Sequence, residues 1–191
     1  MQLVLIRHAR AEARALLKRD RTRALTVDGR RRMRKAARGL HGLLPELSLI
    51  ATSPLTRARQ TAELVAEACG DIDVSLLPAL EPGDTPRAVL TWLRRQPAGA
   101  TLALVGHEPS LGRLAGWLLS SKPSGFVQFK KGAAALIEFT GTPAAGKGKN
   151  NPLNIEAAPA QYMDEARRRN MNPRMLVEFV DGSKTMVEMA A

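Results

Sequence analysis

Three short segments of the chain carry side chains suited to binding an anion. Arg7 and His8 close a run of four apolar residues, Arg57 follows a second apolar run, and His107 follows a third. A guanidinium group binds two oxygens of an anion at once, and an imidazole can act as a nucleophile or carry a proton. Polar groups of this kind at the ends of buried segments are costly unless they bind a ligand. The spacing therefore predicts an anion site built from three separate segments.

The elements that must position these residues follow from the apolar periodicity. Short apolar runs predict strands near 2–7, 47–52, 73–77, 101–106 and 133–139. Helical spacing predicts helices near 26–43, 55–69, 84–95 and 110–120. This alternation is typical of a layered α/β domain with a mainly parallel sheet, in which ligands bind at the carboxyl ends of the strands. We therefore expect the three segments to meet at one edge of the sheet.

The three segments also resemble a known set of motifs. Residues 7–9, 53–61 and 106–109 read Arg-His-Ala, Ser-Pro-Leu-Thr-Arg-Ala-Arg-Gln-Thr and Gly-His-Glu-Pro. In order and separation they are similar to the signatures of the histidine phosphatase superfamily, which is phosphoglycerate mutase-like. The length resembles that of its SixA-type phosphohistidine phosphatases, and the resemblance covers roughly residues 1–140. It implies a three-layer α/β/α sandwich with a mainly parallel central sheet.

The resemblance implies a role for each residue of the motifs. His8 would be the nucleophile and form a covalent phosphohistidine, while Arg7, Arg57 and His107 would surround the phosphoryl oxygens. Arg23 would add another phosphate contact, although Ala24 stands where the SixA-type enzymes have proline. Because phosphoryl transfer needs mainly positioning and positive charge, we expect no metal and no other cofactor.

The general acid is the role with several candidates. Glu81 is the first, because some members of the superfamily use a glutamate in this region. Asp84 and Glu108 are alternatives. A phosphomonoester leaves as a poor alkoxide and benefits from a proton donor, whereas a phosphohistidine has a better nitrogen leaving group. The need for an acid therefore depends on the substrate.

The expected substrate is phosphohistidine on a protein. The segments between the motifs look too short to build a capping insertion over a small metabolite, and an open site suits a protein surface. One alternative is a phosphatase for a small phosphomonoester or nucleotide, which a working Glu81 would favour. Another is a basic, non-catalytic binding protein that keeps the fold.

Composition agrees with an enzyme domain of the cytoplasm. Hydrophobic residues make up 45% of the 191 residues, and the formal net charge is +11. No stretch is apolar enough to span a membrane, the first predicted strand leaves no room for a signal peptide, and Cys69 is the single cysteine. Part of the basic excess lies at 30–38, mainly as a solvated helix face. Nucleic-acid binding is possible but not favoured, because aromatic residues are only 4%.

The sequence changes character after residue 140. We expect a histidine phosphatase domain over 1–140, a linker over 141–152 rich in Gly, Pro and Asn, and an extension over 153–191. The sequence pattern of the extension predicts a short helix over 160–170. It also predicts a candidate β-hairpin, in which 175–180 pairs with 185–189. The resemblance does not cover this extension, and its role and the oligomeric state stay open.

Overall fold

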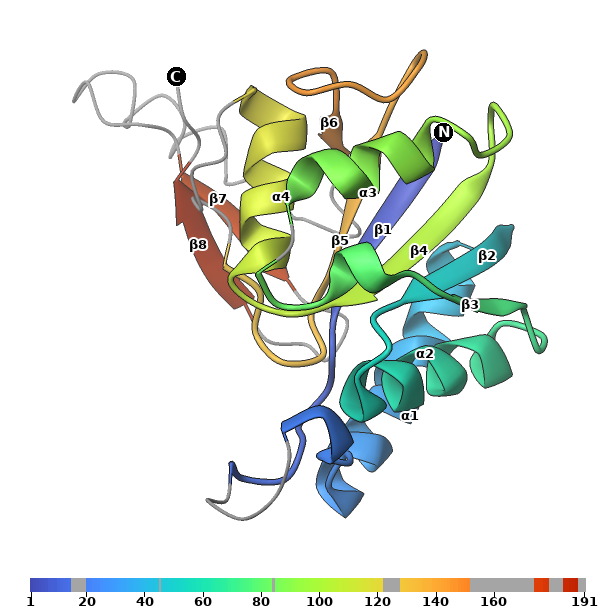
Figure 1. Ribbon diagram of the computed structural model, residues 1–191, viewed down its shortest axis with the longest axis vertical. Coiled ribbons are helices and arrows are strands. Elements are labelled where there is room, and N and C mark those ends of the chain that lie inside the picture. The colour runs from blue at the N-terminus through green and yellow to red at the C-terminus, as the bar shows by residue number, and fades with distance from the viewer. Residues whose placement is uncertain are drawn as a thin grey trace.

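A six-stranded sheet forms the centre of the computed structural model (Figure 1). The structure describes residues 1–14, 20–44, 46–83, 85–121, 128–151, 174–178 and 184–188. The strands of this sheet are β1 (Gln2–Arg7), β2 (Leu47–Thr52), β3 (Val74–Leu76), β4 (Thr101–Gly106), β5 (Ala134–Glu138) and β6 (Lys149–Asn151). The helices are α1 (Val27–Leu43), α2 (Thr56–Ala68), α3 (Pro86–Leu93) and α4 (Ser110–Ser120), with 3-10 turns η1 (Asp20–Thr22) and η2 (Pro78–Leu80).

The strands follow the order β3-β2-β4-β1-β5-β6. The first four are parallel to one another, whereas β5 is antiparallel to β1 and β6 is antiparallel to β5. The predicted α/β fold with a mainly parallel sheet is therefore confirmed. The order also places β4 between β2 and β1, so the segments that follow these three strands emerge side by side.

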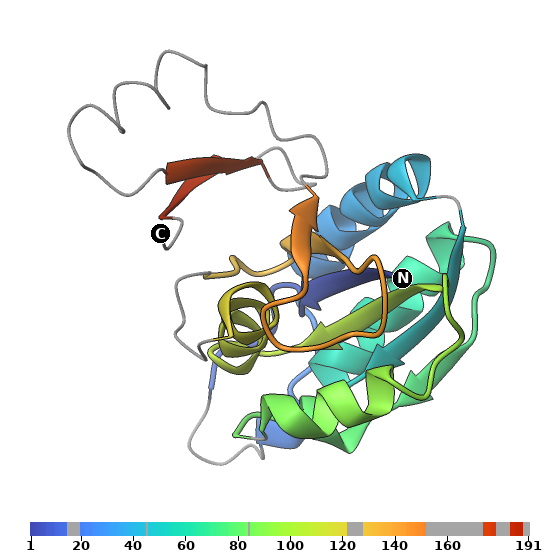
Figure 2. The same ribbon diagram turned by 90° about the horizontal axis from the view of Figure 1, so that it is seen from above.

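Helices cover both faces of the sheet and give the three expected layers. Val4 and Ile6 of β1 are fully buried among apolar side chains of α1 and α2, while Leu3 and Leu5 are buried among those of α3 and α4. This alternation follows from the pleat of a strand buried on both faces. Figures 1 and 2 show the two helix pairs on opposite sides of the sheet. Burying each such aliphatic side chain contributes about 1.5–3 kcal/mol, so both layers stabilise the strand that carries the site.

The span that the sequence predicts to be a linker, 141–152, is part of the domain as far as it is described. Residues 149–151 form β6, and the amides of Gly146 and Gly148 donate to the carbonyl oxygens of Trp117 and Leu118 at 3.0 Å each. These bonds satisfy carbonyls at the end of α4. A Cβ atom at Gly148 would collide with Ile137. Glycine here allows close packing rather than flexibility, so residues 146–151 pack against the end of α4 and against β5.

Two further strands lie near the end of the chain. β7 (Arg174–Glu178) and β8 (Lys184–Glu188) pair antiparallel, with Val177 opposite Thr185. The region of the predicted short helix, 160–170, lies outside the described residues. Within the described part of the chain, no helix is long and apolar enough to cross a membrane.

Candidate active site

Three neighbouring strands deliver the candidate residues to one edge of the sheet. Arg7 is the last residue of β1 and pairs with Gly106 at the end of β4, so His8 and His107 follow their strands at the same level. The rings of these histidines have centroids 5.0 Å apart. Ser53 follows β2, and its amide donates to the carbonyl oxygen of Val105. The three motifs therefore converge as expected.

His8 is buried, with 6% of its surface exposed, and both ring nitrogens have contacts. Nδ1 lies 2.7 Å from the carbonyl oxygen of Ala9, and because a carbonyl only accepts, Nδ1 carries the ring hydrogen. Nε2 then holds a lone pair and accepts from Nε of Arg57 at 3.3 Å. The backbone thus sets a tautomer in which Nε2 holds the lone pair of the ring.

Arg57 lies in the first turn of α2 and is 4% exposed. Its Nη1 donates to the carbonyl oxygen of Asp20 at 2.8 Å, and its Nη2 donates to the Asp20 carboxylate at 3.0 Å. The same carboxylate accepts from Nε of Arg23 at 2.9 Å. A buried cation at the positive end of a helix needs an anion in front of it, and Asp20 supplies one. Asp20 therefore fixes the direction of Arg57 toward His8.

His107 is 2% exposed, and its Nε2 lies 2.9 Å from the hydroxyl oxygen of Ser53. When the hydroxyl donates to Nε2, the ring hydrogen of His107 sits on Nδ1. In the described part of the chain, this buried Nδ1 has no hydrogen-bond partner. A buried donor without a partner is costly, so this atom is available to an incoming ligand.

Arg7 has a similar unsatisfied atom. Its Nη1 donates to the carbonyl oxygen of Phe129, whereas its Nε is buried and has no partner among the described residues. Burial lowers the pKa of the Arg7 guanidinium, although the negative charge of Glu108 acts in the opposite direction. Arg57 therefore contacts Nε2 of His8, the ring of His107 lies beside the His8 ring, and the positive charge of Arg7 acts on His8. This arrangement suits the oxygens of a phosphoryl group.

The environment keeps both histidines neutral. Burial is the main cause that lowers the pKa of His8 to about 4, and the positive charges of Arg57, Arg7 and Lys131 add to it. Burial also lowers the pKa of His107 to about 3, again with contributions from neighbouring cationic groups. A neutral His8 is required for nucleophilic attack, because a protonated imidazole has no free lone pair.

We predict that His8 and His107 will not titrate between about pH 5 and pH 8, whereas an unperturbed histidine titrates near about pH 6.5. The measurement is an NMR pH titration of the imidazole signals, with His8→Ala and His107→Ala used to assign them. The chain has only three histidines, so the spectrum is simple. A midpoint near the ordinary value for His8 would contradict this description of the site.

The lowered pKa values of His8 and His107 also determine how the stability of the protein depends on pH. Both folded-state pKa values lie below the ordinary one, so the unfolded chain binds more protons between about pH 4 and pH 6.5. The free energy of unfolding should therefore fall as the pH drops through this window. Urea unfolding of the wild type and of His107→Ala at several pH values will test this, and the dependence should be weaker in the variant.

Arg23, Glu81 and Glu108, which the sequence also predicts as site residues, each make polar contacts in the structure. Arg23 joins the site through Asp20, and its Nη1 donates to the carbonyl oxygen of Glu12 at 2.7 Å. Both carboxylate oxygens of Glu81 accept from Arg21, at 2.6 and 3.1 Å. Glu108 accepts from the amide of Phe129 at 2.8 Å. Burial raises the pKa of Glu108. The remaining acid candidate, Asp84, lies outside the described residues.

Sequence reasoning missed three residues of the site. Asp20 holds Arg57 and Arg23, Ser53 contacts His107, and the hydroxyl of Thr61 accepts from the amide of Ala9 at 3.0 Å. In the sequence, Asp20 is distinguished only as an acidic residue within a basic stretch, three positions before Arg23. Among the described residues, no group of three or more His, Cys, Asp or Glu side chains could hold a metal ion.

Two family models match this chain, one near its beginning and one near its end. A family model described as the histidine phosphatase superfamily (branch 1) matches residues 3–82. A second model, described as the catalytic domain of oxidoreductase DRL, matches residues 127–191, which contain none of His8, Arg57 and His107. An uncharacterized protein of Picosynechococcus sp. is 38% identical over 150 residues, which cover 73% of this chain and 91% of that protein.

Two solved structures are also similar. One is the protein histidine phosphatase SixA complexed with tungstate, with 28% identity, a TM-score of 0.68, and coverage of 79% of this chain and 94% of the other. The second is a protein of Nakamurella multipartitia assigned as phosphohistidine phosphatase SixA. It has 28% identity, a TM-score of 0.65, and coverage of 78% and 92%.

Proposed function

Since the chain belongs to the histidine phosphatase superfamily, we propose that it is a metal-independent phosphatase that works through His8 and prefers phosphohistidine on a protein. The observation that carries the proposal is the state of His8. Its Nδ1 hydrogen is committed to the carbonyl oxygen of Ala9, and its Nε2 lone pair faces Arg57 in a buried site. A neutral imidazole fixed in one tautomer is prepared for attack on phosphorus.

The reaction proceeds in two displacements. Nε2 of His8 attacks phosphorus, the new N–P bond forms, and the bond from phosphorus to the leaving nitrogen breaks. The leaving imidazole departs with its electron pair and takes a proton from solvent water. A water molecule then attacks the phosphoryl group on His8 and loses a proton to solvent. Inorganic phosphate forms, and the N–P bond breaks with its electron pair returning to Nε2 of His8. Both steps pass charge onto the phosphoryl oxygens, where the guanidinium groups of Arg7 and Arg57 stabilise it.

The unpartnered donors support a phosphoryl ligand. Nε of Arg7 and Nδ1 of His107 are buried and, within the described residues, have no partner, while Arg57 already points at the attacking nitrogen. The similar SixA structure contains tungstate, which is a tetrahedral oxyanion like phosphate. Three donor groups around one tetrahedral anion supply the charge stabilisation that the reaction needs.

The preference for a protein substrate is supported by the architecture. The chain between the first and second motifs forms α1 and β2, and much of the chain between the second and third forms α2, α3 and β4. These helices cover the faces of the sheet (Figures 1 and 2). They are therefore used for the core rather than for a cap over the site. A site that the described residues leave without a cap suits a phosphorylated side chain on a protein surface.

The test compares substrates for the wild-type protein in the presence of a chelator. We expect faster release of phosphate from a phosphohistidine protein than from an aryl phosphate, a sugar phosphate or a nucleotide. Much faster release from a sugar phosphate or a nucleotide would overturn the proposed substrate class. No release from any of them would overturn the proposed activity.

Glu81 is proposed as the proton donor for alcohol leaving groups, once it leaves its ion pair with Arg21. We expect Glu81→Gln to lower turnover of an alkyl phosphate by about 10²-fold but that of phosphohistidine by less than about threefold. The matched comparison is Glu108→Gln, which removes the other described candidate. The same selective loss in Glu108→Gln alone would move the role to Glu108.

A further inference from the structure

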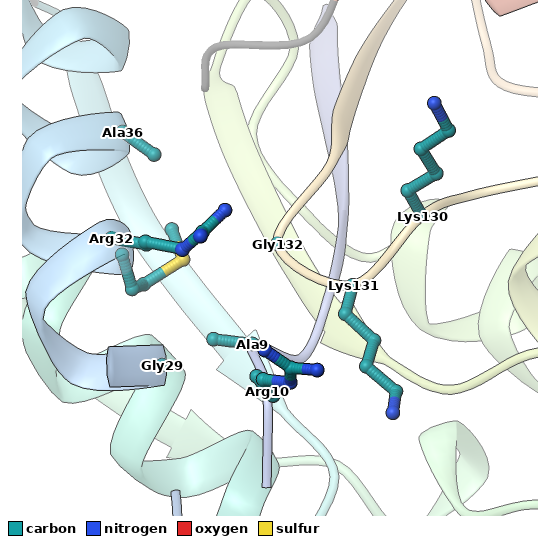
Figure 3. Close-up of a pocket in the computed structure, with 9 residues that line it drawn as sticks. Ala9, Arg10, Gly29, Arg32, Ala36, Lys130, Lys131 and Gly132 are labelled. Carbon is teal, nitrogen blue, oxygen red and sulfur yellow. The ribbon is translucent and has the colours of Figure 1, made fainter. Parts of the chain in front are cut away.

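A basic groove lies beside the nucleophile, between the start of α1 and the loop that precedes β5 (Figure 3). Its volume is about 220 Å³. Its walls carry four cationic side chains, those of Arg10, Arg32, Lys130 and Lys131. Met33 and Ala36 also line the groove but are only 3% and 2% exposed, so they offer little apolar surface to a ligand. The groove is therefore mainly a cationic surface.

The backbone holds this groove in a fixed position relative to His8. The amide of Gly132 donates to the carbonyl oxygen of His8 at 3.2 Å. On the opposite wall, the carbonyl oxygen of Arg10 accepts from the amide of Thr26 at 3.0 Å. Gly29 permits this close approach, because a Cβ atom at that position would collide with the Arg10 carbonyl. Both walls are thus tied to the segment that carries the nucleophile.

Among the described residues that line or adjoin the groove, Arg10, Arg32 and Lys131 carry more positive charge than the carboxylate of Asp28 can balance. The carboxylate of Asp28 contacts Arg31 at 2.7 Å, Arg32 at 2.9 Å and Arg10 at 3.8 Å. One carboxylate therefore serves three guanidinium groups. In Figure 3 the guanidinium group of Arg32 extends from α1 toward Gly132, Arg10 and Lys131 are drawn below it, and Lys130 extends the other way. Arg10 and Arg32 stay largely exposed, with side-chain exposures of 64% and 63%.

We propose that this groove binds an acidic segment of the phosphorylated protein. The inference rests on the proposed function, because it assigns the groove to the protein that carries the phosphohistidine. A guanidinium group can donate two hydrogen bonds to one carboxylate. The contact between Arg32 and Asp28 at 2.9 Å shows that an arginine of this groove binds a carboxylate. The groove directly adjoins the segment that carries His8, so a protein whose phosphohistidine enters the site can also place a neighbouring acidic segment in the groove. This proximity favours a polypeptide as the occupant.

A binding measurement on the full chain tests the groove without any need for turnover. The probe is a fluorescein-labelled, unphosphorylated peptide that carries glutamates at three- and four-residue spacing, and its binding is followed by fluorescence anisotropy. We expect Arg32→Glu to raise the Kd by about tenfold and Arg32→Gln by less, because the first variant adds repulsion. Inorganic phosphate at a concentration that saturates the active site should not displace the peptide.

The matched control is Arg38→Glu, which makes the same charge change on α1. Arg38 is exposed, does not line the groove, and lies on the far side of the helix by its position in the 3.6-residue repeat. This control should change the Kd by less than about twofold if only the groove binds the peptide. Equal weakening in both variants would overturn the proposal. Tighter binding of a single-stranded oligonucleotide, lost in Arg32→Glu, would also overturn it.

A kinetic measurement separates this proposal from the proposed function. In Arg32→Glu the KM for a phosphohistidine protein with an acidic surface should rise about tenfold, with a much smaller change in kcat. The ratio of kcat/KM for this protein to that for an aryl phosphate should therefore fall. An unchanged ratio would overturn the groove proposal, whereas a wild-type protein that hydrolyses neither substrate would overturn the proposed function instead.

Discussion

Replacing His8 by alanine should abolish turnover of phosphohistidine and aryl phosphate alike. The loss in kcat should be on the order of 10⁴-fold or more, because no other group can form the covalent intermediate. The positioning donors of Arg7, Arg57 and His107 would remain, so affinity for inorganic phosphate should change far less than kcat. Steady-state kinetics and phosphate binding measured on the same preparation will show both effects.

A matched control for this variant is His41→Ala. His41 lies in α1, away from the carboxyl ends of the strands, so its removal should leave turnover close to that of the wild type. Retention of more than a small fraction of activity in His8→Ala would show that His8 is not the nucleophile. Equal losses in both variants would point to a general effect of the substitution on the fold.

Arg57→Ala should give the second largest loss, about 10²- to 10³-fold in kcat/KM. Arg57 contacts the nucleophilic nitrogen and is held in position by the main chain and the carboxylate of Asp20. Arg57→Lys keeps the positive charge but loses the planar fork, so it should recover only part of the activity. The measurement is kcat/KM for an aryl phosphate in the three proteins.

The control for Arg57 is Arg59→Ala in the same helix. Arg59 is exposed and pairs with Glu63 at 3.9 Å, so its removal should have little effect on kcat/KM. Circular dichroism will check that Arg57→Ala is folded. Full activity in Arg57→Lys would contradict the requirement for a guanidinium group, and full activity in Arg57→Ala would contradict its role on the phosphoryl group.

Much of the fold follows from apolar periodicity. The strand that ends at Arg7 and the strand that ends at Gly106 are continuous apolar runs, and their boundaries agree with the prediction. The direction of β5 and the presence of β6 do not follow from periodicity, because they depend on pairing between distant segments. Gly148 is an example: its amide caps α4 and its lack of a Cβ allows contact with Ile137, yet in the sequence it looks like part of a linker.

The candidate site could be predicted where a residue type and its place at a strand end coincide. His8 and His107 each directly follow a buried strand, and Arg57 lies in the first turn of a helix. Asp20 could not be found in this way, because its role comes from a loop that folds back onto α2 and brings the carboxylate to Arg57. The groove beside Arg10 depends in the same way on tertiary contact between α1 and the loop before β5.

The most direct test of the account is to trap the phosphoryl group on the enzyme. Wild-type protein is mixed with a phosphohistidine protein, quenched within milliseconds in alkaline denaturant because phosphohistidine is labile in acid, and analysed by peptide mass spectrometry. We predict one added phosphoryl group on His8, which disappears as phosphate is released and is absent from His8→Ala. Turnover with no phosphoryl group on His8, or with the group on another residue, would contradict it.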